Sequence, residues 1–282
     1  MAHQAERVAG ARSWLYTPGT QPRRFDRAAA AGADGLIIDL EDAVPARDKD
    51  VARANAASQL AVPRAPGVLQ AVRINPPATR AGLRDLDALA GAGGRLDAVV
   101  VPKCESPAVL AMVASIFAEA GAAPAVIALV ETGTGVAAIA EVVRAPDLAA
   151  VALGGADLSA DLGCAPAWEM LVVARGLLVI HAAAAQVPLI DSPFFDLADE
   201  SGLRAEAAAA AELGFRSKAA IHPRQVAAIN AAFAPSVDEV EWAHAVLAVA
   251  DGGAGLVDGV MVDAAAARRA RRILAGIRPA TP

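Results

Sequence analysis

Short apolar runs alternate with longer alanine-rich segments along most of the chain. Eight of these runs have the length and composition of β-strands: Trp14–Tyr16, Leu36–Leu40, Leu69–Ile74, Ala98–Val101, Val126–Val130, Val151–Leu153, Pro188–Ile190 and Ser217–Ala220. Their apolar residues are consecutive and do not alternate with polar ones, as is typical of parallel strands covered by helices. The alternation of such strands with helices predicts βαβ units with right-handed crossovers.

Eight units favour a closed barrel over an open, doubly wound sheet. A doubly wound dinucleotide-binding sheet typically has a Gly-rich turn after its first strand. Here that turn is Thr17-Pro18-Gly19-Thr20, and the segments Gly93-Gly94 and Gly154-Gly155 also lack the G-x-G-x-x-G spacing. We therefore predict an α/β fold of the (β/α)8 TIM barrel type, without a dinucleotide site.

The chain continues well beyond the eighth run. This tail is predicted to contain a helix over Asp238–Ala250, a Gly-rich turn over Asp251–Gly255 and a final helix from about Ala264. It is too short to build an independent core. We expect a barrel over 1–222 and a C-terminal extension over 223–282 that packs on its own or a neighbouring subunit, as one domain overall.

Composition narrows the class of protein. The 282 residues are 56% hydrophobic and 20% charged, which predicts a globular protein with a large core. The net charge is −6. The dense basic cluster Arg268, Arg269, Arg271 and Arg272 is interpreted first as the solvated face of a C-terminal helix, and only second as a site for an anionic ligand. Nucleic acid is therefore not expected as a partner.

The predicted setting is cytoplasmic. Cys104 and Cys164 have no second Cys or His at metal-ligand spacing, and the N-terminus lacks the apolar core of a secretory signal. Both thiols are expected to be reduced. The longest nearly apolar stretch, Gly176–Ile190, is shorter than the ~18 residues needed to span a bilayer. No membrane anchor is predicted.

Candidate chemistry is sought at the strand ends, because active sites of (β/α)8 barrels lie at the C-terminal ends of the strands. The polar residues there are Asp39, Glu41, Asp42, Arg73, Asn75, Lys103, Glu131 and Asp157. Glu131 and Asp157 are one βα unit apart, so they should meet at one mouth. Two carboxylates without a nearby Cys or His pair suit Mg²⁺. The alternative for Glu131 is a carboxylate at a helix N-terminus.

The two basic residues at the strand ends, Arg73 and Lys103, can each have a structural or a catalytic role. A permanently charged Arg73 among apolar neighbours needs an anionic partner, either a structural one such as Asp39 or Glu41, or a substrate carboxylate or enolate. Lys103 lies where Schiff-base aldolases place their nucleophile. Surrounding carboxylates, including Glu105, should keep its ammonium charged, which disfavours that role. We expect His222 to cap the helix that follows it.

Several strand-end segments together resemble the HpcH/HpaI aldolase/citrate lyase family, and most of all its citrate lyase β-subunit-like branch. The matching segments, which cover nearly the whole chain in order, are Arg12–Gly19, Asp39–Val44, Val72–Asn75, Val101–Lys103, Val130–Gly133, Gly155–Leu158 and Lys218–Pro223.

The resemblance implies a TIM barrel that assembles as a homotrimer or dimer of trimers and binds Mg²⁺ through Glu131 and Asp157. It implies that Arg73 contacts the oxo-acid carboxylate or the thioester oxygen, and that Asp39, Glu41 and Asp42 surround metal-bound waters. By the same match, Arg24 lies near the phosphates of CoA.

In the tail, the run Asp258–Asp263 resembles the family segment whose aspartate acts as acid/base in the neighbouring subunit, which implies this role for Asp263. The chain departs from the family pattern at Ala264, where proline is common, and at Thr134, where many relatives carry a larger residue. These departures concern the geometry of the lid that this tail segment would form over the site, and hence the choice of substrate.

Together these observations predict a Mg²⁺-dependent carbon–carbon lyase. It would split a 3-hydroxyacyl-CoA of the citryl, malyl or citramalyl type into an acyl-CoA and a 2-oxo acid. The alternatives are a Schiff-base aldolase that uses Lys103, and a subunit of a larger lyase complex that acts on a protein-bound thioester.

Overall fold

The computed structural model describes residues 2–62, 67–92, 95–250 and 254–277. They form two compact units, residues 1–232 and 233–282, which are described separately. The predicted turn over Asp251–Gly255 lies mostly outside the described residues, as does the pair Gly93-Gly94.

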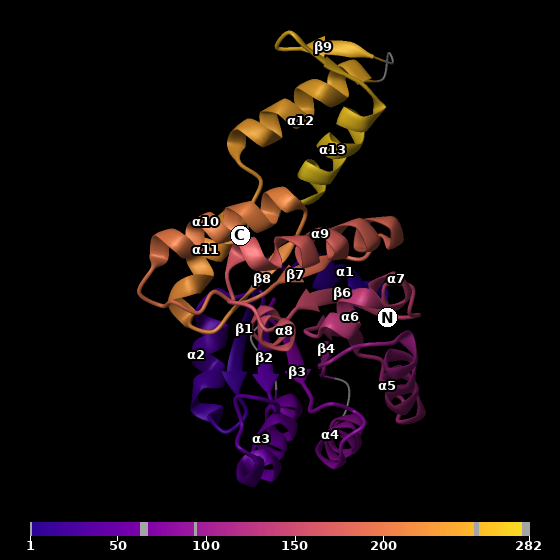
Figure 1. The fold of residues 1–282 in the computed structure, drawn as a ribbon, viewed down its shortest axis with the longest axis vertical. Coiled ribbons are helices and arrows are strands. Elements are labelled where there is room, and N and C mark those ends of the chain that lie inside the picture. The colour runs from indigo at the N-terminus through magenta and orange to yellow at the C-terminus, as the bar shows by residue number, and fades with distance from the viewer. Residues whose placement is uncertain (1, 63–66, 93–94, 251–253, 278–282) are drawn as a thin grey trace. The chain divides into compact units, whose positions relative to one another are not determined.

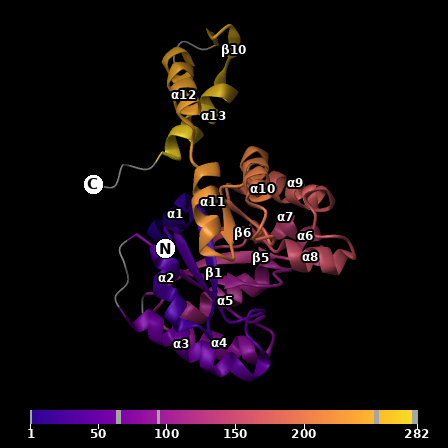
Figure 2. The same ribbon diagram turned by 90° about the vertical axis from the view of Figure 1, so that its left-hand side faces the viewer.

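The first unit is a closed barrel of eight parallel strands, each paired with its sequence neighbours, and β8 pairs with β1. Helices surround the strands in both views (Figures 1 and 2). The TIM barrel prediction is therefore confirmed, and all eight predicted runs form strands. The strands are β1 (Ser13–Pro18), β2 (Gly35–Asp39), β3 (Leu69–Arg73), β4 (Ala98–Val101), β5 (Ala125–Val130), β6 (Leu148–Leu153), β7 (Leu189–Asp191) and β8 (Ser217–Ala220).

Among the described residues, the first helix of this unit precedes β1 and the other helices follow strands along the chain. The α-helices are α1 (Ala2–Gly10), α2 (Phe25–Ala30), α3 (Lys49–Ala61), α4 (Arg80–Ala90), α5 (Pro107–Glu119), α6 (Gly133–Ala137), α7 (Ile139–Val142), α8 (Gly155–Leu162), α9 (Trp168–Ala185), α10 (Glu200–Leu213) and α11 (Val226–Ala232). Three short 3-10 helices are η1 (Pro22–Arg24), η2 (Ala46–Asp48) and η3 (Pro223–Gln225).

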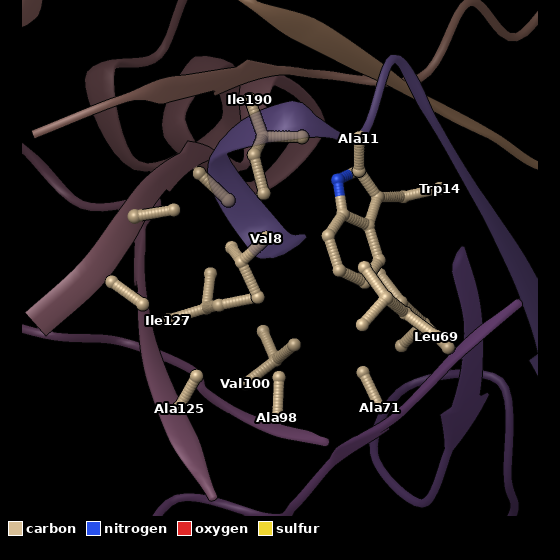
Figure 3. Packing of buried hydrophobic residues seen from close by; sticks show 14 of the residues in the cluster. Val8, Ala11, Trp14, Leu69, Ala71, Ala98, Val100, Ala125, Ile127 and Ile190 are labelled. Carbon is tan, nitrogen blue, oxygen red and sulfur yellow. The ribbon is translucent and has the colours of Figure 1, made fainter. Parts of the chain in front are cut away.

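The barrel interior is filled by alternate residues of the strands. Side chains from several strands converge in Figure 3, among them Trp14, Leu69, Val100 and Ile127. A side chain at Gly35 would collide with the indole of Trp14, because a Cβ there would lie 2.2 Å from its ring. Burying these apolar surfaces contributes about 25 cal/mol per Å².

The helix α1 contributes to the same core. Val8 and Ala11 are buried among the inward side chains of the strands (Figure 3). The sequence did not indicate this helix as part of the barrel. Among its described side chains Val8 is buried and Ala5 is partly buried, so few apolar positions mark this helix in the sequence.

Among the described residues, one helix, α9, is long and apolar enough to cross a membrane, by length and composition alone. One face of it is buried on the barrel, including Leu171, Arg175 and Leu178. Arg175 is paired with Asp191, and a buried face is typical of a helix that covers a parallel sheet.

The second unit contains α12 (Val237–Ala250), a two-stranded antiparallel sheet and α13 (Ala264–Ala275). The strands are β9 (Gly255–Val257) and β10 (Val260–Val262). Ala243, Val246, Val257, Val262 and Ala270 form a small buried cluster. The two predicted helices are present, whereas the sequence analysis did not predict the hairpin.

Candidate active site

A cavity of about 400 Å³ lies at the C-terminal ends of the barrel strands. Its lining brings together most of the residues predicted at the strand ends: Asp39, Asp42, Arg73, Glu131 and Asp157. Glu41 is buried and makes an ion pair with Arg73. The floor is apolar because inward residues such as Ile37, Ile127 and Leu129 continue the barrel core into the cavity.

Arg73 is the central cation of this cavity. Its Nε and Nη2 each donate to one oxygen of Asp39 at 2.7 Å, and its Nη1 lies 2.9 Å from Glu41 Oε2. The guanidinium also lies over the ring of Tyr16, 5.1 Å from the centroid. Burial lowers the pKa of Arg73, but the hydrogen bonds and charge of Asp39 outweigh it, so the net pKa is raised.

Asp39 fixes both Arg73 and the loop that follows β2. Its Oδ1 accepts from the Glu41 amide at 2.9 Å, and its Oδ2 accepts from the Ala43 amide at 3.1 Å. Lys49 Nζ donates to the carbonyl oxygens of Leu40 and Glu41 at 2.7 and 2.6 Å. The loop is therefore held from both sides, which positions Glu41 beside Arg73.

Glu131 follows β5 and is buried, with 1% of its surface exposed. Its Oε1 accepts from the Lys103 amide at 2.9 Å, while Oε2 has no hydrogen-bond partner among the described residues. Burial raises the pKa of Glu131 to about 8, and the charges of Glu41 and Asp157 add to the rise. Thr132, not Glu131, caps α6 by accepting from the Gly135 amide.

Gly154 gives the Glu131 carboxylate its space. A Cβ at Gly154 would lie 2.4 Å from Glu131 Cβ and 2.6 Å from Oε2. Three residues later Asp157, half-buried in the first turn of α8, also lines the cavity. The strands β5 and β6 are paired, so the two carboxylates belong to neighbouring strand ends as predicted.

The donor set fits a hard cation. Across the described residues, no group of three or more His, Cys, Asp or Glu side chains is arranged to hold a metal. Mg²⁺, however, is commonly bound through one or two carboxylates and completes its octahedron with water and substrate oxygens. A buried carboxylate oxygen without a partner, beside a second carboxylate, is the kind of position that such a cation satisfies.

Lys103 connects two carboxylates of the site. Its Nζ lies 3.0 Å from Glu41 Oε1 and 3.7 Å from Glu131 Oε1. Burial lowers the pKa of Lys103, but Glu131 and Glu41 together outweigh it and raise the net pKa. The predicted neighbour Glu105 instead accepts from the Thr132 hydroxyl. The amine of Lys103 is thus held charged by Glu41 and Glu131.

The pattern of this chain matches the model of the HpcH/HpaI aldolase/citrate lyase family over residues 12–223. The chain belongs to this family. A (3S)-malyl-CoA thioesterase of Cereibacter sphaeroides is 34% identical over 98% of this chain and 96% of its own length. An L-malyl-CoA/β-methylmalyl-CoA lyase of the same species is 32% identical over 93% of each chain.

A solved structure supports the same membership. CitE from Mycobacterium tuberculosis, crystallised with magnesium, acetoacetate and coenzyme A, superposes with a TM-score of 0.80 at 34% identity. The match covers 94% of this chain and 98% of CitE. Both units of this HpcH/HpaI family member therefore have counterparts in a protein of known structure.

Two further predicted site residues, Arg24 and Asp263, are not among the residues that line the cavity. Arg24 is exposed at the end of η1. Asp263 belongs to the second unit, where it caps α13 by accepting from the amides of Ala265 and Ala266 at 2.8 and 3.1 Å. These backbone hydrogen bonds lower the pKa of Asp263. His222 caps η3 as expected, because its Nδ1 accepts from the Arg224 amide at 3.2 Å.

Of the charged and aromatic residues in the lining, the sequence analysis missed three. Tyr16 points inward from β1 beside Arg73, and Phe195 lies in the loop after β7. Asp191 ends β7 and is held by Arg175 Nε at 2.9 Å and Lys218 Nζ at 2.6 Å. Asp191 directly follows a predicted strand, so the strand-end rule would have found it. Tyr16 required the inward register of β1 to be known.

Proposed function

We propose that this protein is a Mg²⁺-dependent lyase that splits a 3-hydroxyacyl-CoA into an acyl-CoA and a 2-oxo acid. The observation that carries the proposal is the cavity in which Arg73 lies near a buried carboxylate, Glu131, whose Oε2 has no partner. The similar lyase and the magnesium- and CoA-bound CitE support the substrate class.

In this proposal Glu131 and Asp157 hold the cation. Bound there, Mg²⁺ would supply Lewis-acid polarisation of the substrate oxygens. Asp39, Glu41 and Asp42 would accept from waters around it, although Asp39 and Glu41 also keep Arg73 in place. The apolar floor excludes water, which strengthens the electrostatic interactions inside the cavity.

Arg73 would bind the carboxylate of the oxo acid or the thioester oxygen. A guanidinium fixed on Asp39 is preorganised, so it can stabilise negative charge that develops during cleavage without reorganising. Arg24 would contact the phosphates of CoA. Asp263 of a neighbouring subunit would move the proton, which requires an oligomer such as the predicted homotrimer or dimer of trimers. The two free cysteines agree with a cytoplasmic setting.

A thioesterase is the second candidate, because the relative that matches 98% of this chain is named as one. Hydrolysis would release CoA without cleaving a carbon–carbon bond. The Schiff-base alternative is disfavoured by the raised pKa of Lys103. A protein-bound thioester would make free CoA esters poor substrates.

A panel of malyl-, citramalyl- and citryl-CoA tests these candidates with purified protein. Two products are measured in parallel, free thiol and 2-oxo acid, with Mg²⁺ and after chelation. A lyase gives 2-oxo acid without free thiol, and chelation stops it. Glu131→Ala and Asp157→Ala should abolish this activity while the protein stays folded. Thiol release alone would identify a thioesterase, and full activity after chelation would overturn the metal mechanism.

A further inference from the structure

Lys103 holds Glu131 through two different groups. Its amide donates to Glu131 Oε1 at 2.9 Å, and its ammonium lies 3.7 Å from the same oxygen. Both contacts are made to Oε1, so Lys103 occupies this oxygen of the carboxylate. The other oxygen, Oε2, is left without a partner on the side of Gly154.

The backbone of Lys103 is unusual for a lysine. Its φ is +49°, in the left-handed region that favours glycine, and only three other non-glycine residues of the described chain have positive φ. Such a conformation costs on the order of 1 kcal/mol and persists where the surrounding structure enforces it. At this position the amide of Lys103 meets Glu131, while Cys104 next to it donates to the Leu129 carbonyl at 3.0 Å.

The ammonium of Lys103 also separates two carboxylates. It lies 3.0 Å from Glu41 Oε1, and both Glu41 and Glu131 are buried. The ammonium thus attracts the carboxylate of Glu131 toward the Lys103 side of the cavity. Glu41 is in turn fixed from its other oxygen by Arg73.

We propose that Lys103 is a positioning residue that holds Glu131 Oε1, so that Oε2 is presented to the cation beside Asp157. This inference rests on the metal site of the proposed function and assigns to Lys103 a role in it that is neither nucleophile nor ligand. Groups that orient metal ligands typically change metal affinity by 10–100-fold when they are removed.

The direction of the change in cation affinity distinguishes a positioning role of Lys103 from a purely electrostatic one. Removing a positive charge close to a divalent cation would, by Coulomb's law alone, strengthen cation binding. Removing a group that orients the ligand weakens binding. The two roles therefore predict opposite changes in affinity for the same variant, Lys103→Met, which keeps the backbone amide and most of the unbranched side chain but removes the ammonium.

The test is direct binding of Mn²⁺, followed by the electron paramagnetic resonance signal of the free ion, without any substrate. We expect Lys103→Met to bind Mn²⁺ about tenfold more weakly than the wild type, and Lys103→Arg, which keeps a cationic donor, to stay closer to the wild type. Arg84→Met is the control, because Arg84 is an exposed residue of α4 whose ion-pair partner, Asp50, lies outside the cavity lining.

Circular dichroism of each variant checks that the barrel remains folded. Unchanged or tighter Mn²⁺ binding by folded Lys103→Met would overturn the inference while leaving the proposed metal site standing. A wild-type protein that binds no Mn²⁺ would overturn both. A loss of affinity shared equally by Arg84→Met would show that removing any positive charge lowers affinity and would overturn a specific role for Lys103.

Discussion

At the scale of single residues, the site depends on how each charge is held. Arg73 faces Asp39 through two hydrogen bonds at 2.7 Å and approaches Glu41 through its third nitrogen. Its partners are thus the structural ones that the sequence suggested as alternatives. Arg73 nevertheless lines the cavity, with 11% of its side chain exposed, so a substrate anion can reach it.

We predict that Arg73→Lys is strongly impaired although it keeps the charge. An ammonium is a point donor and cannot reproduce two parallel hydrogen bonds to Asp39 while a third nitrogen faces Glu41. Loss of a well-placed donor to developing charge typically lowers kcat by about 10²–10³. Steady-state kinetics measure this, with Arg84→Lys on the exposed side of α4 as the control. A lysine variant with near-wild-type turnover would reduce Arg73 to a structural ion pair.

The carboxyl of Glu131 predicts how stability of the metal-free protein depends on pH. Its pKa is about 8 in the fold against 4.5 for the free side chain, chiefly because of burial, with Glu41 and Asp157 adding negative charge and Lys103 opposing them. The folded state therefore binds a proton that the unfolded state releases between these values. The contribution of this carboxyl to stability is full below about pH 4.5 and is lost as the pH rises toward 8.

Glu131→Gln should remove this loss, because the amide stays neutral and its oxygen can still accept from the Lys103 amide. Without metal, the variant should be more stable than the wild type at pH 8, and the difference should vanish near pH 4.5; each unit of pKa corresponds to about 1.4 kcal/mol. Urea unfolding at both pH values measures it. Equal differences at the two pH values would show that ionisation of Glu131 is not responsible.

At the scale of elements, the eight strands were predictable because burial on both faces leaves consecutive apolar residues. Short elements that bury only a few side chains could not be predicted in this way. The strand β10 (Val260–Val262) has one buried residue, and its partner β9 (Gly255–Val257) also has one. Strand ends identified the acidic residues of the site except Asp191, whereas Tyr16 lies within β1 and depends on the inward register of that strand.

Two glycines, Gly154 and Gly176, allow a test variant and a control variant of the metal site to be compared. Gly154 lies between β6 and α8, where a Cβ would meet Glu131 at 2.4 Å. Gly176 lies within α9, and a Cβ there would have no heavy atom within 4 Å. We predict that Gly154→Ala displaces the Glu131 carboxylate and weakens Mn²⁺ binding at least about tenfold. Gly176→Ala should leave binding unchanged and stabilise α9 by up to about 1 kcal/mol.

Mn²⁺ titration and thermal unfolding of both variants test this prediction. The barrel itself should tolerate Gly154→Ala better than the site does, because the position lies at the rim of the cavity and not in the core. If Gly154→Ala binds Mn²⁺ like the wild type, the space beside Glu131 Oε2 is not what the cation requires.

At the scale of the whole molecule, the chain forms two units, and the proposed chemistry draws on both. The barrel holds the cavity, whereas Asp263 belongs to residues 233–282. The sequence could indicate Asp263 only through the family resemblance, because a single aspartate before a helix is most often a cap. It is indeed a cap of α13, and two backbone amides lower its pKa, so it is a carboxylate at neutral pH.

We predict that Asp263 acts on the cavity of a neighbouring subunit. Asp263→Asn should be inactive but folded, because asparagine is also a good helix cap. Glu131→Ala should be inactive for a different reason, the loss of a ligand. When the two inactive proteins are dissociated, mixed and reassembled, some cavities would combine an intact Glu131 with an intact Asp263 from the adjacent chain.

Partial activity of the mixed oligomers is therefore the expected result, measured as 2-oxo acid release after separate and joint reassembly. Each variant reassembled alone controls for residual activity, and a mixture of Asp263→Asn with Asp157→Ala should recover to a similar extent, because Asp157 belongs to the same barrel as Glu131. A mixture of Glu131→Ala with Asp157→Ala should not recover, since every cavity would then lack a ligand. Recovery absent from both mixtures with Asp263→Asn, or a fully active monomer, would show that the proton is moved by a residue of the same chain.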